Sequence, residues 1–131
     1  MLGVFERTFN LVKTALKLRS YKHSLLASNI ANVDTPGYRR KDISFEKVIQ
    51  SYLSERGGLK TTHPQHLKGF RKSLKELIKT YEEESLGTPN NVNLEEELVQ
   101  LTENQMLYEA TLQALSKELE RLREAITEGG R

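Results

Sequence analysis

Two histidines of the chain, His63 and His66, stand three residues apart, a spacing that places side chains on one face of a helix. Such a pair is half of a common metal site, because imidazole nitrogens bind zinc and other transition metals. Pro64 lies between the two histidines, and neither a cysteine nor a cluster of carboxylates adjoins them. We therefore expect no metal site and no cofactor at this position.

Sequence motifs of enzymes are not found. The chain contains no G-x-x-x-x-G-K-[ST] phosphate loop, no G-x-G-x-x-G dinucleotide fingerprint and no G-x-S-x-G nucleophile elbow. It also contains no cysteine, which excludes disulfides and thiolate metal ligands and leaves the cellular compartment open. We expect neither catalysis nor a small-molecule substrate.

Basic residues indicate a different chemistry, the binding of nucleic-acid phosphates. They form the run 39–41 and a looser group made of Lys68, Arg71, Lys72, Lys75 and Lys79. The net charge is only +2, and few aromatic residues are available to stack on bases. The residues before the C-terminal segment are acidic and turn-forming, unlike the continuous basic helix that leads into a DNA-binding zipper. Nucleic-acid binding is therefore the weakest alternative, and we expect no such partner.

The longest regular pattern in the chain lies at residues 94–126, where apolar residues recur in alternating steps of four and three. This heptad pattern predicts a long amphipathic helix of the coiled-coil kind. Asn93 is a suitable N-cap, and Gly129-Gly130 is expected to end the helix. The predicted interface residues are, at a, Leu98, Gln105, Leu112, Leu119 and Ile126, and, at d, Leu94, Leu101, Tyr108, Leu115 and Leu122.

The predicted C-terminal helix is longer than the fold that would have to cover it. Some 33 residues make a rod of about 50 Å, whereas a compact chain of this length would measure about 36 Å across. The apolar seam is therefore expected to need a partner along its whole length. An ordinary core helix of a helix bundle is the alternative interpretation.

Residues 2–31 predict a second long helix with the same period. Its seam residues are Leu2, Phe5, Phe9, Val12, Leu16, Arg19, His23, Leu26 and Ile30, of which the apolar ones from Phe5 onward are predicted to lie in the coiled-coil interface. Arg19 and His23 interrupt the middle of this seam. No N-cap is evident, so we expect the first turns to be disordered in the free monomer.

The residues between the two long helices are less regular. Thr35-Pro36-Gly37-Tyr38 predicts a type II turn, and a short helix is expected from about Ser44 to Gly57, with Phe45, Val48, Ile49, Tyr52 and Leu53 on one face. Residues 67–81 allow an amphipathic helix, whereas 77–86 also allow a strand, before a turn at 87–91.

These patterns together predict a mainly α fold that forms one structural domain. Two long terminal helices make an elongated coiled-coil-like hairpin or bundle, with a short helix and a loop or small β segment between them. The predicted segments are 1–35, 36–92 and 93–131. Residues 1–50 contain nine basic and four acidic side chains, and residues 92–131 contain the reverse. Opposite charges favour a meeting of the two ends, within one chain or between chains.

The segment 24–38, S-L-L-A-S-N-I-A-N-V-D-T-P-G-Y, closely resembles the N-terminal signature A-S-N-I-A-N-x-x-T-P-G-Y of bacterial flagellar rod and hook proteins. Segments 41–45, 62–67 and 90–97 resemble later motifs of a short member of that family. Asn29 and Asn32 either bond the backbone of a neighbouring subunit or cap their own helix. The signature residues, which we expect to matter for assembly, are Ser28, Asn29, Asn32, Asp34, Thr35, Pro36, Gly37 and Tyr38.

The resemblance implies a structural subunit of the proximal rod of the flagellar basal body, which assembles through coiled-coil pairing of its terminal helices. It further implies a periplasmic location reached through the flagellar type III export apparatus, without a cleaved signal peptide. The implied partners are copies of the chain itself, rod subunits of the FlgC type, the adaptor FliE and the membrane ring protein FliF. A cytoplasmic coiled-coil adaptor is the alternative function.

Overall fold

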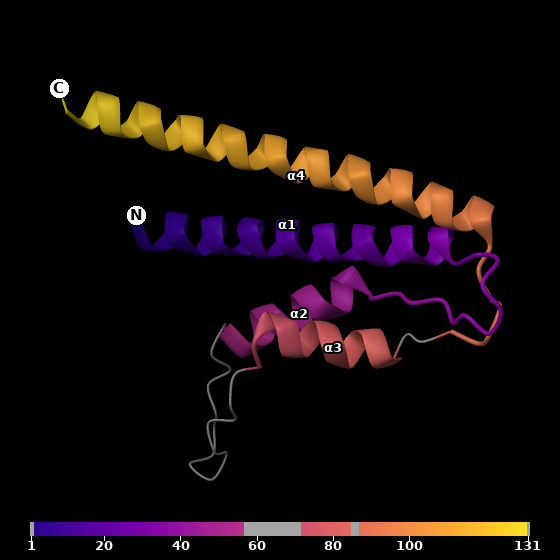
Figure 1. The fold of residues 1–131 in the computed structure, drawn as a ribbon. Helices are drawn as coiled ribbons and strands as arrows, with labels where there is room; N and C mark the ends of the chain where they lie inside the picture. Colours follow the sequence, from indigo (N-terminus) through magenta and orange to yellow (C-terminus); the bar gives the residue numbers. More distant parts are fainter. Residues whose placement is uncertain (1, 57–71, 85–86, 131) are drawn as a thin grey trace, which may run out of the picture.

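The computed structural model describes residues 2–56, 72–84 and 87–130. Within these ranges it contains four helices, α1 (Leu2–Ala31), α2 (Phe45–Arg56), α3 (Leu74–Glu84) and α4 (Leu94–Gly129) (Figure 1). The described residues form no strand, and a single antiparallel bridge joins Arg39 to Pro89. The predicted mainly α fold with two long terminal helices is confirmed. The strand alternative for 77–86 is wrong over 77–84, which belong to α3.

The four helices form three layers with α1 in the middle. α4 runs antiparallel to α1 on one side, and the pair of α2 and α3 lies on the other side, so that both chain termini are at the same end (Figure 1). α1 has 30 residues and α4 has 36, which correspond to about 45 and 54 Å. α4 therefore has more length than α1 can cover.

The hydrophobic core lies between α1 and the pair of α2 and α3. Its buried side chains are Leu18, Leu25, Ile43, Val48, Tyr52 and Leu77. The face predicted for α2 is confirmed at Val48 and Tyr52, which are buried, and at Phe45 and Ile49, which pack against the core. Leu53 is exposed instead. Leu67 and Phe70 lie outside the described residues.

Local capping chemistry explains where two of the helices begin. The side chain of Asn93 accepts hydrogen bonds from the backbone amides of Glu95 and Glu96, which confirms the predicted N-cap of α4. At α3, Ser73 and Glu76 bond each other's backbone amides in a capping box that the sequence analysis did not identify. α4 ends at Gly129, as predicted. Disorder of the first turns of α1 in the free monomer stays a prediction.

Candidate functional site

The signature segment, residues 24–38, covers about the last two turns of α1 and forms the turn that follows it. Asn32 caps this end of the helix, because its amide nitrogen donates to the carbonyl of Ser28 (2.8 Å) and its carbonyl accepts from the Thr35 hydroxyl (3.1 Å). The Tyr38 amide bonds the carbonyl of Thr35 (3.2 Å), and Gly37 between them has φ +75°. These features confirm the predicted type II turn. The capping interpretation of Asn32 is the one that the contacts support.

Asn29 is completely buried, and its side-chain amide is used entirely within the chain. Its nitrogen donates to the carbonyl of Lys41 (2.7 Å) and to a carboxylate oxygen of Glu97 (3.2 Å), while its oxygen accepts from the Lys41 amide (3.0 Å) and the Tyr38 hydroxyl (2.9 Å). It has no donor left for the backbone of a neighbouring subunit, and it does not cap its own helix. Asn29 instead ties α1 to the connecting segment and to α4.

Tyr38 closes the other side of this cluster. Its hydroxyl donates to Asn29 and lies 3.2 Å from the Ser28 hydroxyl, so that the turn folds back onto the helix it has just left. The segment after Tyr38 pairs with the segment that leads into α4, through bonds from Asn90 to Tyr38 (2.8 Å) and from Gly87 to Arg40 (2.8 Å). Asp34 and Pro36 of the signature are exposed on the turn.

Arg40 and Glu97 form a largely buried ion pair next to Asn29. Glu97 is only 1% exposed, and its second carboxylate oxygen accepts from Asn29. Arg40 also bonds Asp42 (3.1 Å) and Gln100 (3.1 Å). Burial opposes the charge of Arg40, but its hydrogen bonds to Glu97 and Asp42 outweigh burial and raise its pKa. We name the four side chains Asn29, Tyr38, Arg40 and Glu97 the latch.

The latch changes the interpretation of the basic run 39–41. Phosphate binding was the function considered for this run, and Arg40 does not fit it, because its guanidinium bonds Glu97, Asp42 and Gln100 within the chain. Lys41 contributes its backbone to Asn29. Lys72, Lys75 and Lys79 are exposed, while Lys68 and Arg71 lie outside the described residues.

A second polar contact joins the two long helices about ten residues from the latch. Asn104 is 2% exposed and donates to the backbone carbonyl of Arg19 (2.8 Å), while the Arg19 guanidinium donates to the Asn104 oxygen (3.4 Å). The same guanidinium lies 3.6 Å from the ring centre of Phe45, a cation–π contact. The seam interruption at Arg19 therefore links α1, α2 and α4.

The residues of α4 that are covered follow their own heptad pattern, which differs from the predicted one by one row. The predicted d row is half-buried at four of its five positions, while the predicted a row is exposed throughout. The other covered positions form the g row, which lies one residue before the a row and is polar. Besides Gln100, which bonds Arg40, the covered residues of α4 are Glu97, Leu101, Asn104, Tyr108, Thr111, Leu115, Glu118 and Leu122.

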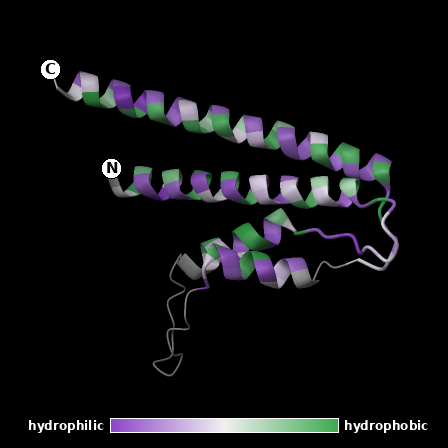
Figure 2. Ribbon diagram, viewed as in Figure 1, coloured by the Kyte–Doolittle hydropathy of each residue, from purple (hydrophilic) through white to green (hydrophobic). Residues whose placement is uncertain are grey.

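The a row therefore forms an exposed stripe along α4. Leu98 is 47% exposed, Leu112 42%, Leu119 44% and Ile126 67%, and hydrophobic residues recur along α4 into its last turns (Figure 2). Leu94, at d, is also exposed, as is Gln105. We name Leu98, Leu112, Leu119 and Ile126 the exposed row.

The predicted interface residues of α1 divide by their place along the helix. Leu26 is fully buried and Ile30 half-buried near the latch, whereas Phe5, Phe9, Val12 and Leu16 are half-buried toward the free end. The rings of Phe5 and Phe9 stack on each other, 6.1 Å apart. The flanking row Leu18 and Leu25 belongs to the core with α2 and α3.

Sequence reasoning missed Arg19, Arg40, Glu97 and Asn104 as structural residues. Glu97 is one of three glutamates in the first turn of α4, where acidic residues are common, and Asn104 lies outside the a and d rows. The only signal in the sequence is that these positions of α4 recur every seven residues. A row made of Glu97, Asn104, Thr111 and Glu118, however, is typical of the solvent-facing side of a helix. Glu97 and Asn104 can be buried only because residues on distant segments form hydrogen bonds with them.

Comparison with known proteins places this arrangement in a family. The profile described as "Flagella basal body rod protein" matches residues 13–39, which include most of α1 and the signature turn. The flagellar basal body rod protein FlgB of Aquifex aeolicus is 35% identical over 106 residues, which cover 81% of this chain and 82% of the relative. The chain belongs to the FlgB family.

Further members of the FlgB family match over nearly their whole length. The FlgB protein of Buchnera aphidicola is 30% identical, over 93% of this chain and 96% of the relative. That of Escherichia coli is 28% identical, over 98% and 99%. The similarity to the FlgB family therefore extends well beyond the signature to both long helices.

Two other kinds of feature are absent from the described residues. In the ranges that the structure describes, no helix is long and apolar enough to cross a lipid bilayer. Within the same ranges, no three potential metal-ligating side chains are grouped together. His63 and His66 lie outside the described residues.

Proposed function

We propose that this chain is a structural subunit of the flagellar rod that joins its neighbours through the exposed row of α4. The observation that carries this proposal is the burial pattern of α4, whose d row packs against α1 at four of its five positions while its a row, apolar except at Gln105, is exposed to water. Burying a leucine side chain is worth about 1.5–3 kcal/mol, so a row of such residues strongly favours association.

The latch gives a second, independent argument for the proposal. Polar contacts hold α1 and α4 together within one chain, so the a row is not required for the fold of the hairpin. A hairpin that is held together by buried polar contacts and leaves an apolar row exposed to solvent is suited to assembly. The role proposed for this chain is structural and not catalytic.

Family membership supports association with other components of the basal-body rod. We include in the proposal the finer partners that the signature implies, namely copies of the chain, FlgC-type subunits, FliE and FliF. It also includes a periplasmic place of action that the chain reaches through the type III export apparatus, without a cleaved signal peptide.

The test replaces Leu112 and Leu119 together with aspartate, in a bacterium whose own copy has been deleted. We expect the variant to be folded by circular dichroism but unable to support swimming or intact rods, because charges would then occupy the proposed contact. The matched control replaces Gln113 and Lys117, exposed residues of the same helix outside the exposed row, with aspartate. Motile cells carrying the first variant would refute this role of the row.

A further inference from the structure

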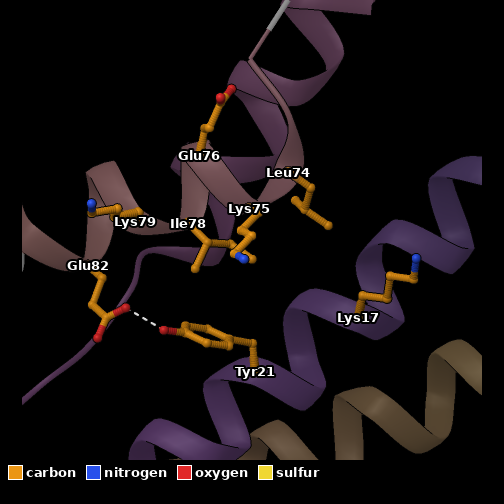
Figure 3. A pocket seen from close by; sticks show the side chains of 8 residues that line it. All are labelled: Lys17, Tyr21, Leu74, Lys75, Glu76, Ile78, Lys79 and Glu82. Atoms are coloured by element: carbon orange, nitrogen blue, oxygen red, sulfur yellow. Dashed lines mark hydrogen bonds between the residues drawn. The ribbon is translucent and has the colours of Figure 1, made fainter.

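A groove of about 670 Å³ lies between α1 and α3, on the side of α1 that faces away from α4 (Figures 1 and 3). Tyr21 of α1 and Leu74 and Ile78 of α3 point into it (Figure 3). Hydrogen bonding between Tyr21 and Glu82 joins the two walls. The groove is of the size that holds several apolar side chains of a ligand or partner.

Basic side chains border the groove on both walls. Lys17 lies on α1, and Lys75 and Lys79 lie on α3. None of the three forms an ion pair with any residue that the structure describes. Glu82 accepts from Tyr21, and Glu76 is used in capping α3. The lining therefore contains three lysines and two glutamates, and its net charge is positive.

The exposed row has the opposite character. Residues 105–128 contain five glutamates and three basic residues, and one of the glutamates is paired with Arg121. Glu120 and Glu124 are exposed and have no ion pair among the described residues, whereas Arg123 is a basic exception beside the row. Leu112, Leu119 and Ile126 are seven residues apart, about one anchor every 10 Å. This spacing suits a helix that lies in a groove.

The groove and the exposed row of one chain cannot meet. α4 is packed against one side of α1 and α3 lies on the other side (Figure 1), so the row of a given chain is separated from its own groove by the body of α1. An apolar, acidic row and an apolar, lysine-bordered groove on different faces are complementary only between molecules.

We propose that the groove between α1 and α3 receives the exposed row of α4 from a second copy of this chain. The inference rests on the proposed function and names the surface that the row meets. Because the two surfaces differ, the contact is heterologous, and each copy added presents a new row and a new groove. Contacts of this kind build open helical assemblies unless they close into a ring.

Site-directed crosslinking tests the pairing directly, because the native chain has no cysteine. Ser116, one turn from both Leu112 and Leu119, is replaced with cysteine in one preparation, and Lys75 is replaced in another that carries a different tag. After mixing, a bifunctional maleimide should yield dimers that carry both tags. The control replaces Lys117, on a different side of α4, and should crosslink to Lys75→Cys far less. Equal yields from the two positions, or dimers formed mainly between Ser116→Cys chains, would overturn the proposal.

A charge exchange gives a second test that leaves the core untouched. With Lys75→Cys kept as the crosslinking site, the Lys17→Glu/Lys79→Glu variant should lower crosslinking by about tenfold, because two attractions become repulsions. Adding Glu120→Lys/Glu124→Lys to the other partner should restore it. Lys47→Glu, at an exposed position of α2, is the matched control. If the double variant crosslinks as the wild type does, the groove is not the partner surface.

The same variants separate this inference from the proposed function in cells. Loss of rods with Leu112→Asp/Leu119→Asp, together with normal rods in Lys17→Glu/Lys79→Glu cells, would overturn the groove as partner and leave the role of the row standing. Loss of rods in both, with recovery on charge exchange, is the expected result. Normal rods in both would overturn the two proposals together.

Discussion

The two ends of the hairpin formed by α1 and α4 are built in different ways. At the closed end, residues 19–31 meet residues 94–104 through buried polar side chains, and Asn29, Glu97 and Asn104 all have hydrogen-bond partners there. At the open end, residues 2–16 and 108–129, the helices share half-buried apolar side chains. Thr14, the one buried polar residue among these that the structure describes, bonds the carbonyl of Asn10 in its own helix.

This difference teaches how one hairpin serves both its own fold and an assembly. Buried polar groups that are fully paired specify one geometry, because any other arrangement would leave a donor or acceptor without a partner. Apolar contacts are less directional, so a partner can add to them without undoing what exists. The buried polar contacts at the closed end determine the geometry, and three of the four residues of the exposed row, Leu112, Leu119 and Ile126, lie at the open end.

Amide hydrogen exchange of the monomer should show the largest difference between the two ends. We expect the amides of residues 20–31 and 94–104 to exchange only with global unfolding, which costs about 5–15 kcal/mol in typical domains. The amides near both termini should open at a small fraction of that free energy. Uniform protection along α1 and α4 would break the comparison.

Replacing Glu97 with alanine should destabilise the monomer by about 3 kcal/mol, because it leaves the half-buried guanidinium of Arg40 without its most buried partner. Chemical denaturation followed by circular dichroism measures this loss. Glu103→Ala, an exposed position on the same helix, should change the unfolding free energy by no more than about 0.5 kcal/mol. Similar values for both variants would show that the latch has no special role.

Replacing Asn29 with alanine should cost about 2–3 kcal/mol, since the backbone groups of Lys41 and the Tyr38 hydroxyl lose a buried partner. Asn32→Ala removes only contacts at the more exposed helix end and should cost about 1 kcal/mol. The comparison uses the same denaturation experiment. A larger loss of unfolding free energy for Asn32→Ala would show that the turn, and not the contact between α1 and α4, contains the more important polar contact.

Two glycine substitutions should have opposite signs at the two ends. Gly37→Ala should destabilise by about 1 kcal/mol, because φ is +75° there; no atom lies within 4 Å of the added Cβ, so the cost is conformational. Gly3→Ala lies inside α1 and should stabilise by at most about 1 kcal/mol, less if the first turns fray. A full gain at Gly3 in a denaturation curve would indicate an open end as well ordered as the closed one.

An alkaline titration tests the hydrogen bond between Tyr21 and Glu82, which joins α3 to α1. Burial, helped by the hydrogen bond to Glu82 and by the charge of Glu82, raises the pKa of Tyr21 to about 12. An unfolded tyrosine titrates near pH 10, so this contact contributes stability below about pH 10 that is lost as pH rises toward 12. Ultraviolet titration should show one tyrosine that ionises late and is missing in Tyr21→Phe. Unchanged curves would contradict this environment.

The elements themselves were predictable from the sequence because their signals are local. Asn93 and Gly129 bound α4 as expected, Pro36-Gly37 forms the expected turn, and the apolar period of residues 2–31 and 94–126 matches two long helices. The face of α2 was correct at Val48 and Tyr52 because a short amphipathic helix has one apolar stripe. The signature residues were identified by resemblance, and their contacts were not.

The amino-acid sequence by itself determined where the helices lie, how long they are and that an apolar row remains uncovered, since spacing and capping depend on neighbours along the chain. Tertiary structure alone decided which row of α4 turns toward α1. That rotation is set by contacts between distant residues, such as Asn29 with Glu97, 68 residues away, and Arg19 with Asn104, 85 residues away. The most apolar seam was the obvious candidate for the internal contact, yet paired polar groups hold the hairpin and leave that seam's a row on the outside.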